Sequence, residues 1–303
     1  MEQLHTSTVT PDQIDHLGHM NVRYYTVLAG LGAQELTTRL GLGGDGGPEI
    51  WSRDIHVRHH REQLVDARLE VRGGVLDARP DRLRIYEELA NLDSGELAAT
   101  FVLGLAAVTG EDRRPAGIPG PVLDRARERM VEVPEHGRAR SISFDDDPTA
   151  AAPALEDLRT LELAQREARV LQPAECDVGG WYRSDMIMEL VWGGVPLAGR
   201  GFQPFHDAPE GRTMGWATME TRSAWLRVPR VGDRVQSFAA ETDLAAKTMT
   251  TRHWVYDLDR SEPVCVFSIV NLAFDLASRR SMPIPDALRE ELHRRLQRDL
   301  AGS

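Results

Sequence analysis

The spacing of apolar residues in the first part of the chain predicts a short strand, one long helix and then four strands. Apolar side chains recur at helical intervals along residues 22–40, and small residues, including glycines, lie among them. Because glycine weakens a helix, its presence there predicts that this helix packs closely against a sheet. Strands are expected at residues 50–58, 67–76, 83–89 and 97–108.

The second part of the chain repeats this order. Residues 182–197 have the pattern of a helix. Strands are expected at residues 215–228, 234–242, 248–257 and 264–275. Between the two halves, residues 121–132 have a helical pattern, and residues 133–152 are rich in Pro, Ala and Asp, which is typical of a linker.

Short motifs at both ends of each half indicate an internal duplication. The matched positions near the start are Pro11 with Pro173, Asp15 with Asp177, and Gly18 with Gly180. Each pair is 162 residues apart (177 − 15), whereas Arg114 and Arg280, near the ends of the halves, are 166 residues apart (280 − 114). This small drift corresponds to one change in loop length. We therefore predict a first domain at residues 1–130, a linker at residues 131–159 and a second domain at residues 160–303.

Length, charge and cysteine content narrow the functional classes. The 303 residues suffice for two ordinary domain cores. A net charge of −11 argues against nucleic acid or an anionic membrane as a partner, since both attract basic surfaces. No apolar run reaches the ~18 residues of a membrane helix, and no secretory signal is expected. With only Cys176 and Cys265, no disulfide framework is expected, and a cytoplasmic location is the simplest expectation.

The most specific motif lies where the first strand leads into the predicted helix. Residues 15–21 read Asp-His-Leu-Gly-His-Met-Asn, and Tyr25 follows. The pattern Asp-x-x-Gly-His-x-Asn-x-x-x-Tyr resembles the signature of the 4-hydroxybenzoyl-CoA thioesterase family. This resemblance implies an α+β fold of the tandem (double) hotdog type, in which each copy is a long helix wrapped by an antiparallel sheet. It also implies hydrolysis of an acyl-CoA thioester. One departure is Val22, where the family usually has a second asparagine.

A second similarity bears on the acyl group. Residues 55–59 (Ile-His-Val-Arg-His) and 97–100 (Leu-Ala-Ala-Thr) are similar to segments of small bacterial thioesterases linked to carnitine breakdown. Together with the substrate for which the larger family is named, this similarity implies a small acyl group that is either betaine-like or aromatic.

The resemblance assigns catalytic roles to three residues of the motif. Asp15 corresponds to the family's catalytic aspartate and is expected to act as a general base or as a nucleophile. Backbone N–H groups from Gly18 onward are expected at a helix N-terminus, where they would stabilise a developing oxyanion. Asn21 is expected to orient water, and His19 to position Asp15 or the thioester carbonyl. The alternative is a structural turn in which these polar residues only cap the helix.

Because the chain is acidic and coenzyme A is an anion, substrate binding requires a local basic cluster. Arg58, His59 and Arg61 are the densest candidates, with a solvated strand edge as the alternative, and Gly18 and Tyr25 are expected to contact substrate. No metal site is expected, because alternate residues of a strand face opposite sides and the neighbouring histidines do not converge. Coenzyme A enters as part of the substrate, and no separate cofactor is predicted.

The second copy keeps only part of the motif. Asp177 and Gly180 are retained, whereas Trp181 and Arg183 replace the histidine and the asparagine. We expect this copy to have lost the chemical site. The alternative is that Glu189, on the second predicted helix, serves as a carboxylate base.

Two other functions fit the sequence. An acyl-ACP thioesterase has the same double-hotdog architecture, although an acidic protein suits an acidic carrier protein poorly. A non-catalytic acyl-binding double-hotdog protein is the second alternative, and the altered second copy favours it. The leading hypothesis has an acyl-CoA substrate as partner, no nucleic acid and no membrane, and it leaves a homo-oligomeric assembly open.

Overall fold

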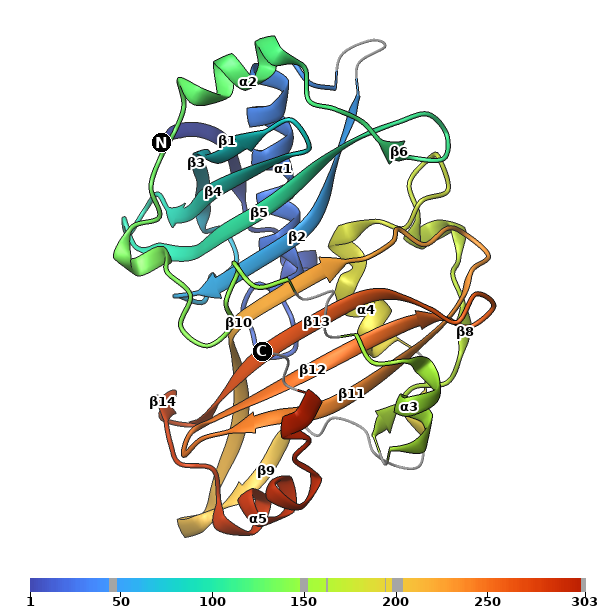
Figure 1. The fold of residues 1–303 in the computed structure, drawn as a ribbon. Helices are drawn as coiled ribbons and strands as arrows, with labels where there is room; N and C mark the ends of the chain where they lie inside the picture. Colours follow the sequence, from blue (N-terminus) through green and yellow to red (C-terminus); the bar gives the residue numbers. More distant parts are fainter. Residues whose placement is uncertain (44–47, 148–151, 162, 194, 198–203, 301–303) are drawn as a thin grey trace. The chain divides into compact units, whose positions relative to one another are not determined.

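The computed structural model divides the chain into two compact units, Met1–Arg140 and Ser141–Ser303 (Figure 1). The described residues are 1–43, 48–147, 152–161, 163–193, 195–197 and 204–300. Each unit has its own antiparallel strands and its own buried apolar side chains. Within these described ranges, no helix is long and apolar enough to cross a membrane.

The first unit is an antiparallel sheet with one long helix. Its elements are β1 (Glu2–Thr8), α1 (Val22–Arg39), β2 (Glu49–His59), β3 (Arg68–Arg79), β4 (Arg82–Asn91), β5 (Leu97–Thr109), β6 (Arg114–Pro115) and α2 (Gly120–Arg127). The strands follow the order β1-β3-β4-β5-β2, and β6 pairs with β5. The predicted long helix and the predicted strands are confirmed in this unit, as is the hotdog arrangement of a helix against an antiparallel sheet.

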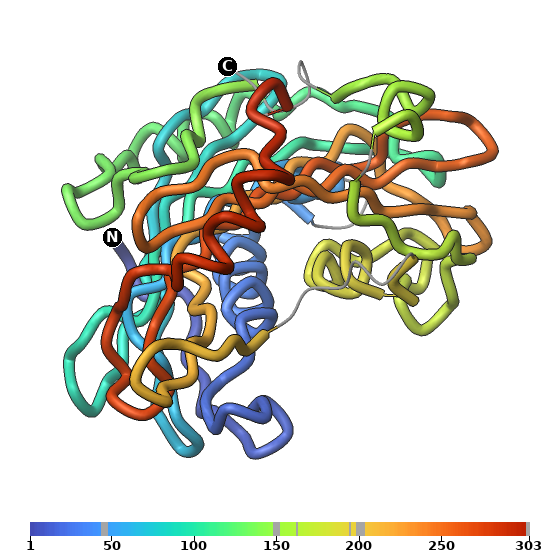
Figure 2. Tube along the Cα trace, turned by 90° about the horizontal axis from the view of Figure 1, so that it is seen from below, coloured from blue at the N-terminus to red at the C-terminus, as the bar shows by residue number. Residues whose placement is uncertain are grey.

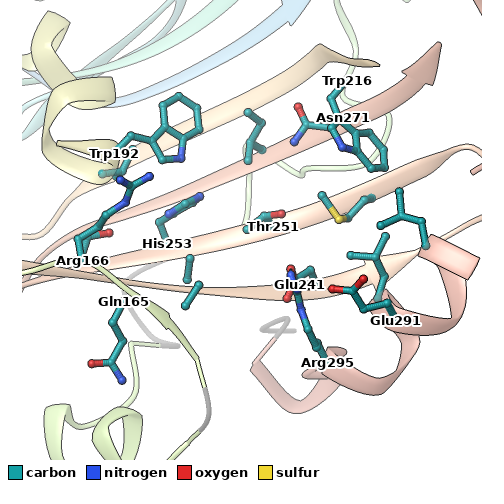
Figure 3. Close-up of a pocket in the computed structure, with 18 of the residues that line it drawn as sticks. Gln165, Arg166, Trp192, Trp216, Glu241, Thr251, His253, Asn271, Glu291 and Arg295 are labelled. Atoms are coloured by element: carbon teal, nitrogen blue, oxygen red, sulfur yellow. Dashed lines mark hydrogen bonds and ion pairs between the residues drawn. The ribbon is translucent and has the colours of Figure 1, made fainter. Parts of the chain in front are cut away.

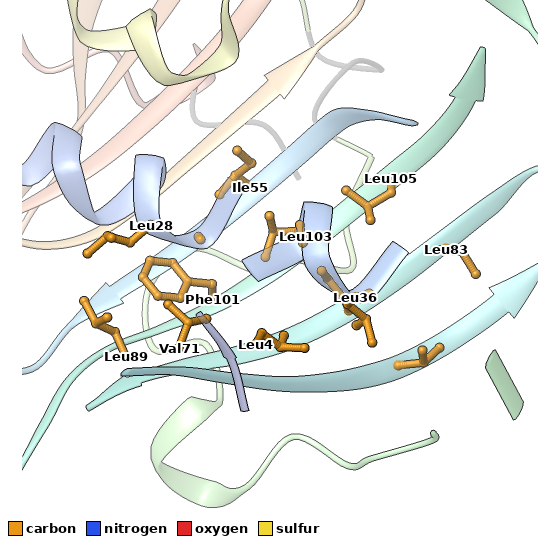
Figure 4. Close-up of a cluster of buried hydrophobic side chains, with 14 of the residues drawn as sticks. Leu4, Leu28, Leu36, Ile55, Val71, Leu83, Leu89, Phe101, Leu103 and Leu105 are labelled. Atoms are coloured by element: carbon orange, nitrogen blue, oxygen red, sulfur yellow. The ribbon is translucent and has the colours of Figure 1, made fainter. Parts of the chain in front are cut away.

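Helix α1 approaches the sheet at a distance that only a residue without a side chain permits. Leu28 and Leu36 are buried between the helix and the strands (Figure 4). A Cβ atom on Gly32 would lie 2.6 Å from Cγ1 of Val71, whereas a Cβ atom on Gly30 would meet nothing within 4 Å. The prediction of close helix packing is therefore confirmed, and Gly32 is the glycine that permits it.

The second unit repeats the sheet but not the long helix. Its elements are α3 (Leu155–Thr160), β7 (Ala164–Gln165), β8 (Arg169–Val170), α4 (Ile187–Trp192), β9 (Phe205–Ala208), β10 (Arg212–Trp225), β11 (Arg234–Leu244), β12 (Thr248–Asp257), β13 (Glu262–Asp275), β14 (Arg280–Ser281) and α5 (Asp286–Arg295). The strands follow the order β10-β13-β12-β11-β7. The long strands β10 to β13 confirm those predicted for this half.

The pairing register of the strands confirms the internal duplication. Leu69 in β3 is opposite Asn91 in β4, and Val235 in β11 is opposite Asp257 in β12. Both members of the second pair are 166 residues beyond those of the first (235 − 69 and 257 − 91). The same separation relates the pairs along β4 and β5 to those along β12 and β13. Residues separated in this way occupy the same position in the two sheets.

The helix predicted at residues 182–197 is wrong in its extent. Helix α4 has 6 residues, whereas α1 has 18, and Figure 2 shows the long blue helix and the short yellow one. At Gly193 the backbone becomes extended (φ −64°, ψ 153°), and Pro196 follows shortly afterwards. Because proline lacks an N–H group and keeps the residue before it extended, the helix cannot continue through this segment. Residue 194 lies outside the described part of the chain.

The segment that follows α2 is folded into the first unit. Val131 N–H donates to the carbonyl oxygen of Val75, in β3, at 2.8 Å. The guanidinium of Arg58, in β2, donates to the carbonyl oxygen of His136 at 2.8 Å. This segment, predicted as the start of a linker, therefore packs against the first sheet as far as Arg140, where the first unit ends.

Candidate active site

The turn between β1 and α1 is held in one conformation by its own backbone. Asp15 N–H donates to the carbonyl oxygen of His19 at 2.9 Å, and Gly18 N–H donates to that of Asp15 at 3.0 Å. Gly18 has a φ of +85°, a conformation that residues with a Cβ atom rarely adopt. A Cβ atom there would meet nothing within 4 Å. The turn therefore requires glycine for its backbone conformation, and it is open on the side of Gly18.

Asp15 and His19 on this turn form a chain of polar side chains with Glu62, which lies after β2. Oδ1 of Asp15 accepts a hydrogen bond from Leu17 N–H at 2.8 Å. Its other oxygen, Oδ2, lies 3.5 Å from Nδ1 of His19. Nε2 of the same imidazole lies 3.5 Å from Oε1 of Glu62. The side chains of Asp15 and His19 are 16% and 15% exposed, so the imidazole lies between two carboxylates at a site that solvent partly reaches.

The loop that follows β2 supports the turn from the other side. Met20 N–H donates to the carbonyl oxygen of Gln63 at 2.7 Å. The buried Gln63 side chain in turn accepts a hydrogen bond from Nδ2 of Asn91 at 2.8 Å. Because Glu62 directly precedes Gln63, this anchoring brings the Glu62 carboxylate to His19. Neither loop residue was identified from the sequence, since both are far from the motif along the chain and only the folded loop brings them to it.

Asn21 is the N-cap of α1. Its side-chain oxygen accepts a hydrogen bond from Arg23 N–H at 3.0 Å, and the helix begins at Val22. Asn21 therefore caps the helix, as the structural alternative expects. Its predicted role in orienting water stays a prediction.

The backbone donors predicted for an oxyanion are fewer than expected. The N–H groups of Gly18 and Met20 already have acceptors, because the helix begins after the motif turn and not at Gly18. In the part of the chain that the structure describes, the N–H group of His19 has no acceptor. His19 N–H is thus the donor that the turn leaves available for a negative oxygen.

Tyr25 connects α1 to the same loop. Its hydroxyl donates to the carbonyl oxygen of Arg61 at 3.1 Å, and its ring meets that of His59 edge-on, with centroids 4.9 Å apart. Burial raises the pKa of the Tyr25 phenol far above its usual value, and Glu62 adds to this effect, so the phenol is a neutral donor. At 3% exposed, Tyr25 acts on the site by placing the loop, and its contact with substrate stays a prediction.

The predicted basic cluster does not form. His59 faces α1 and packs on Tyr25, whereas Arg58 is 6% exposed and is bound to backbone carbonyl oxygens. Arg61 lies beyond the strand, is 65% exposed and pairs with Glu96 at 3.4 Å. The prediction of one phosphate-binding cluster is therefore corrected, because successive residues of a strand face opposite sides of a sheet.

His59 and His60 also add no positive charge at neutral pH. Burial lowers the pKa of His59 to about 3. Burial, with the nearby Arg58 guanidinium, lowers the pKa of His60 to about 4. Both imidazoles are therefore neutral at physiological pH and give an anionic substrate no charge to bind.

The equivalent turn of the second unit has the same backbone and different side chains. Asp177 N–H donates to the carbonyl oxygen of Trp181 at 2.8 Å, as in the first unit. Oδ1 of Asp177 accepts hydrogen bonds from the N–H groups of Gly179 and Trp181, at 2.9 and 3.0 Å. The Trp181 ring, in place of the histidine, lies under the Arg230 guanidinium, 4.3 Å from its carbon. Asp15 and Asp177 therefore occupy equivalent turns, as predicted, but only the first turn carries an imidazole.

The remaining candidates are Glu189, the two cysteines and a metal site. Glu189 is exposed on α4, away from the core of its unit. Cys176 and Cys265 do not form a disulfide, and Cys265 is fully buried in the apolar part of β13. Among the residues that the structure describes, no group of three or more His, Cys, Asp or Glu side chains is arranged to hold a metal ion.

Comparisons with known proteins agree with this geometry. Residues 9–134, which include the whole Asp15 turn, match the family model of the thioesterase-like superfamily. A comparison with curated proteins gives no match.

The solved structures that resemble the chain over both units include two ACP thioesterases. The 12:0-ACP thioesterase from Umbellularia californica is 12% identical, with a TM-score of 0.64 over 89% of this chain and 93% of that one. An acyl-ACP thioesterase from Bacteroides thetaiotaomicron is 11% identical, with a TM-score of 0.61 over 88% of this chain and 96% of that one. At these identities the likeness shows the fold, and it confirms the tandem hotdog architecture. The match to the thioesterase-like superfamily covers residues 9–134, which lie in the first unit.

Proposed function

We propose that the chain hydrolyses an acyl thioester and that Asp15 acts on it as a general base or a nucleophile. The observation that carries this proposal is the chain of Asp15, His19 and Glu62, in which an imidazole lies 3.5 Å from each of two carboxylates. The superfamily match of the first unit supports thioester chemistry. Because the equivalent turn of the second unit has Trp181 in place of the histidine, we assign the reaction to the first unit alone.

Hydrolysis of a thioester needs an activated oxygen and a donor for the developing oxyanion. As a general base, Asp15 takes a proton from water while the water oxygen bonds to the carbonyl carbon. As a nucleophile, it forms an acyl-enzyme anhydride that water then hydrolyses. In both routes the C–S bond breaks, and the thiolate leaves and takes up a proton. Oδ2 is suited to this step, because Leu17 N–H already binds Oδ1, and His19 N–H can donate to the oxyanion.

The carrier of the acyl group has two candidates. The motif favours acyl-CoA, and its resemblance favours a small acyl group that is betaine-like or aromatic. Because Arg58, His59 and Arg61 do not form one basic cluster, the phosphates of CoA would have to bind other arginines. Acyl-ACP is the second candidate, because two of the solved structures that span both units are named as ACP thioesterases. A purely acyl-binding role is less well supported, since the side chains needed for chemistry are assembled on the turn.

Thiol release from a panel of short, long and aromatic acyl-CoAs and acyl-ACPs tests this function. We expect turnover of at least one thioester, and we expect Asp15→Asn to lower kcat by roughly a hundredfold or more. Asp177→Asn is the matched control at the equivalent turn and should leave kcat within a few-fold. Turnover of no thioester, or equal losses in the two variants, would contradict the proposal.

A further inference from the structure

The second unit contains a cavity of about 390 Å³ on one face of its sheet. Strands β11, β12 and β13 form its floor, and residues of α4 and α5 form part of its wall. In the first unit, the corresponding face of the sheet is covered by α1 and the apolar core. Because α4 has 6 residues where α1 has 18, the short helix covers less of this face.

The floor of the cavity is polar at positions that are apolar in the first unit. Ser237, Thr251 and Asn271 line the cavity. The residues 166 positions earlier, which the strand register makes equivalent, are Val71, Ile85 and Leu105, all buried in the first core. Ser237 and Asn271 are 4% and 5% exposed, and all three side chains border the cavity. An apolar occupant would leave these groups buried without hydrogen-bond partners, which costs free energy, so the polar floor indicates a polar occupant.

His253 gives an independent indication of a ligand. It lines the cavity, is 6% exposed, and its Nδ1 is buried without a partner among the residues described. Its ring meets that of Trp192 edge-on, with centroids 5.8 Å apart. Burial lowers the pKa of His253 to about 3, and the nearby Arg166 guanidinium adds to this effect. The imidazole is therefore neutral and offers hydrogen-bonding capacity to a bound molecule.

Charged side chains of opposite sign lie at the two ends of the cavity. Arg166 lies with Trp192 and His253 at one end, and Glu241, Glu291 and Arg295 lie at the other (Figure 3). Arg295 pairs with both carboxylates, with Nη1 3.0 Å from Oε1 of Glu291. Two carboxylates therefore share one guanidinium at this end, and the guanidinium of Arg166 lies at the other end.

We propose that the second unit binds a small zwitterion in this cavity, with its carboxylate toward Arg166 and its ammonium group toward Glu241 and Glu291. The neutral polar groups of Thr251, Asn271 and His253 would bind the middle of the molecule. This site goes beyond thioester hydrolysis, and it would make the second unit a ligand-binding domain. A hydrocarbon chain is a poorer occupant, because it would leave the polar floor and the charged ends without partners.

Calorimetric titration of the full chain with matched probes tests the site. The probes are δ-aminovalerate, which carries both charges, valerate with only the carboxylate, pentylamine with only the ammonium group, and decanoate as an acyl chain. We expect δ-aminovalerate to bind at least roughly tenfold more tightly than each of the others. Tighter binding of decanoate would identify an acyl pocket. Equal binding of all the probes, or no binding, would also overturn the proposal.

Variants of residues that line the cavity test whether δ-aminovalerate binds there, and which end of the cavity binds its carboxylate and which its ammonium group. The double variant Thr251→Ile with Asn271→Leu introduces the side chains that the first unit carries at the same positions. It should abolish δ-aminovalerate binding. Arg166→Gln should remove the advantage of δ-aminovalerate over pentylamine, and Glu291→Gln its advantage over valerate. Circular dichroism checks that each variant is folded. If the double variant does not fold, the test rests on Arg166→Gln, Glu291→Gln and the probe series on the unmodified chain. Unchanged probe preferences in both single variants would refute the site.

Discussion

Nε2 of His19 lies 3.5 Å from Oε1 of Glu62, a residue that the loop after β2 carries to the motif turn. The other imidazole nitrogen lies 3.5 Å from Oδ2 of Asp15. A carboxylate on each side restricts rotation of the ring, so Nδ1 stays directed at Asp15. Glu62 is half-exposed and acts through His19, so we regard it as a positioning residue.

Glu62→Gln should lower kcat by roughly threefold to tenfold and leave KM nearly unchanged, because the change weakens orientation of His19 without removing Asp15. Steady-state thiol release measures both constants. Glu62→Asp should restore part of the lost rate, which a merely structural defect would not allow. Glu96→Gln is the matched control, since Glu96 pairs with Arg61 of the same loop and is exposed. A kcat unchanged in Glu62→Gln would show that this contact does not contribute.

Arg58 and Arg61 should differ in their effect on stability. Arg58→Ala removes a buried guanidinium that binds backbone carbonyl oxygens of the segment after α2, and it should cost about 2–4 kcal/mol of unfolding free energy. Arg61→Ala removes an exposed ion pair and should change the unfolding free energy by less than about 1 kcal/mol. Urea denaturation measures both. Equal, small effects would mean that Arg58 does not hold this segment.

Local features of the site could be predicted from the sequence, whereas its distant contacts could not. The Asp15 turn is encoded within a few residues, including the glycine with positive φ, so the motif placed Asp15, Gly18 and His19 together. Glu62 reaches His19 only because the Gln63 carbonyl binds the turn, and nothing in the local pattern indicates this pairing. The error over Arg58 was avoidable, since strand alternation alone separates it from His59.

The fold was predictable to a similar degree. Strands and α1 follow from their apolar periodicity, and the duplication follows from matched motifs. In the second half, apolar periodicity alone predicts a helix that is too long. Gly193 and Pro196 both signal that the helix ends earlier. The cavity of the second unit was not predicted, because its polar floor becomes visible only when the strand register aligns the two copies.

Two glycines of α1 should respond oppositely to substitution by alanine. Gly32→Ala places a Cβ atom 2.6 Å from Val71 and 2.7 Å from Oε1 of Glu87, so it should destabilise the protein by about 1–3 kcal/mol. Gly30→Ala meets no atom within 4 Å and should stabilise it by about 0.5–1 kcal/mol through helix propensity. Thermal and urea denaturation of both variants check this. Similar effects of the two changes would contradict the close approach at Gly32.

Glu87 gives the last prediction, because it is a fully buried carboxyl group beside Gly32 in the first core. Its relative exposure is 0%, and neither oxygen has a hydrogen-bond partner among the described residues. Burial raises the pKa of Glu87 well above its usual value. The folded state therefore holds a proton that the unfolded chain loses above about pH 4.3. Between these two pKa values the folded state binds more protons, so raising the pH through this interval weakens folding.

Glu87→Gln removes this titration and should make stability less dependent on pH. At about pH 3, well below the unfolded-state pKa of about 4.3, both states of the wild type are protonated at this site, so the variant and the wild type should differ little in pH response. As the pH rises to 8, the wild type should lose stability relative to the variant by an amount on the order of 1 kcal/mol or more. Urea denaturation across this range measures the difference, with Glu96→Gln as the exposed control, for which the difference should stay flat. A flat difference for Glu87→Gln as well would mean that the buried carboxyl group is ionised and compensated in the folded state.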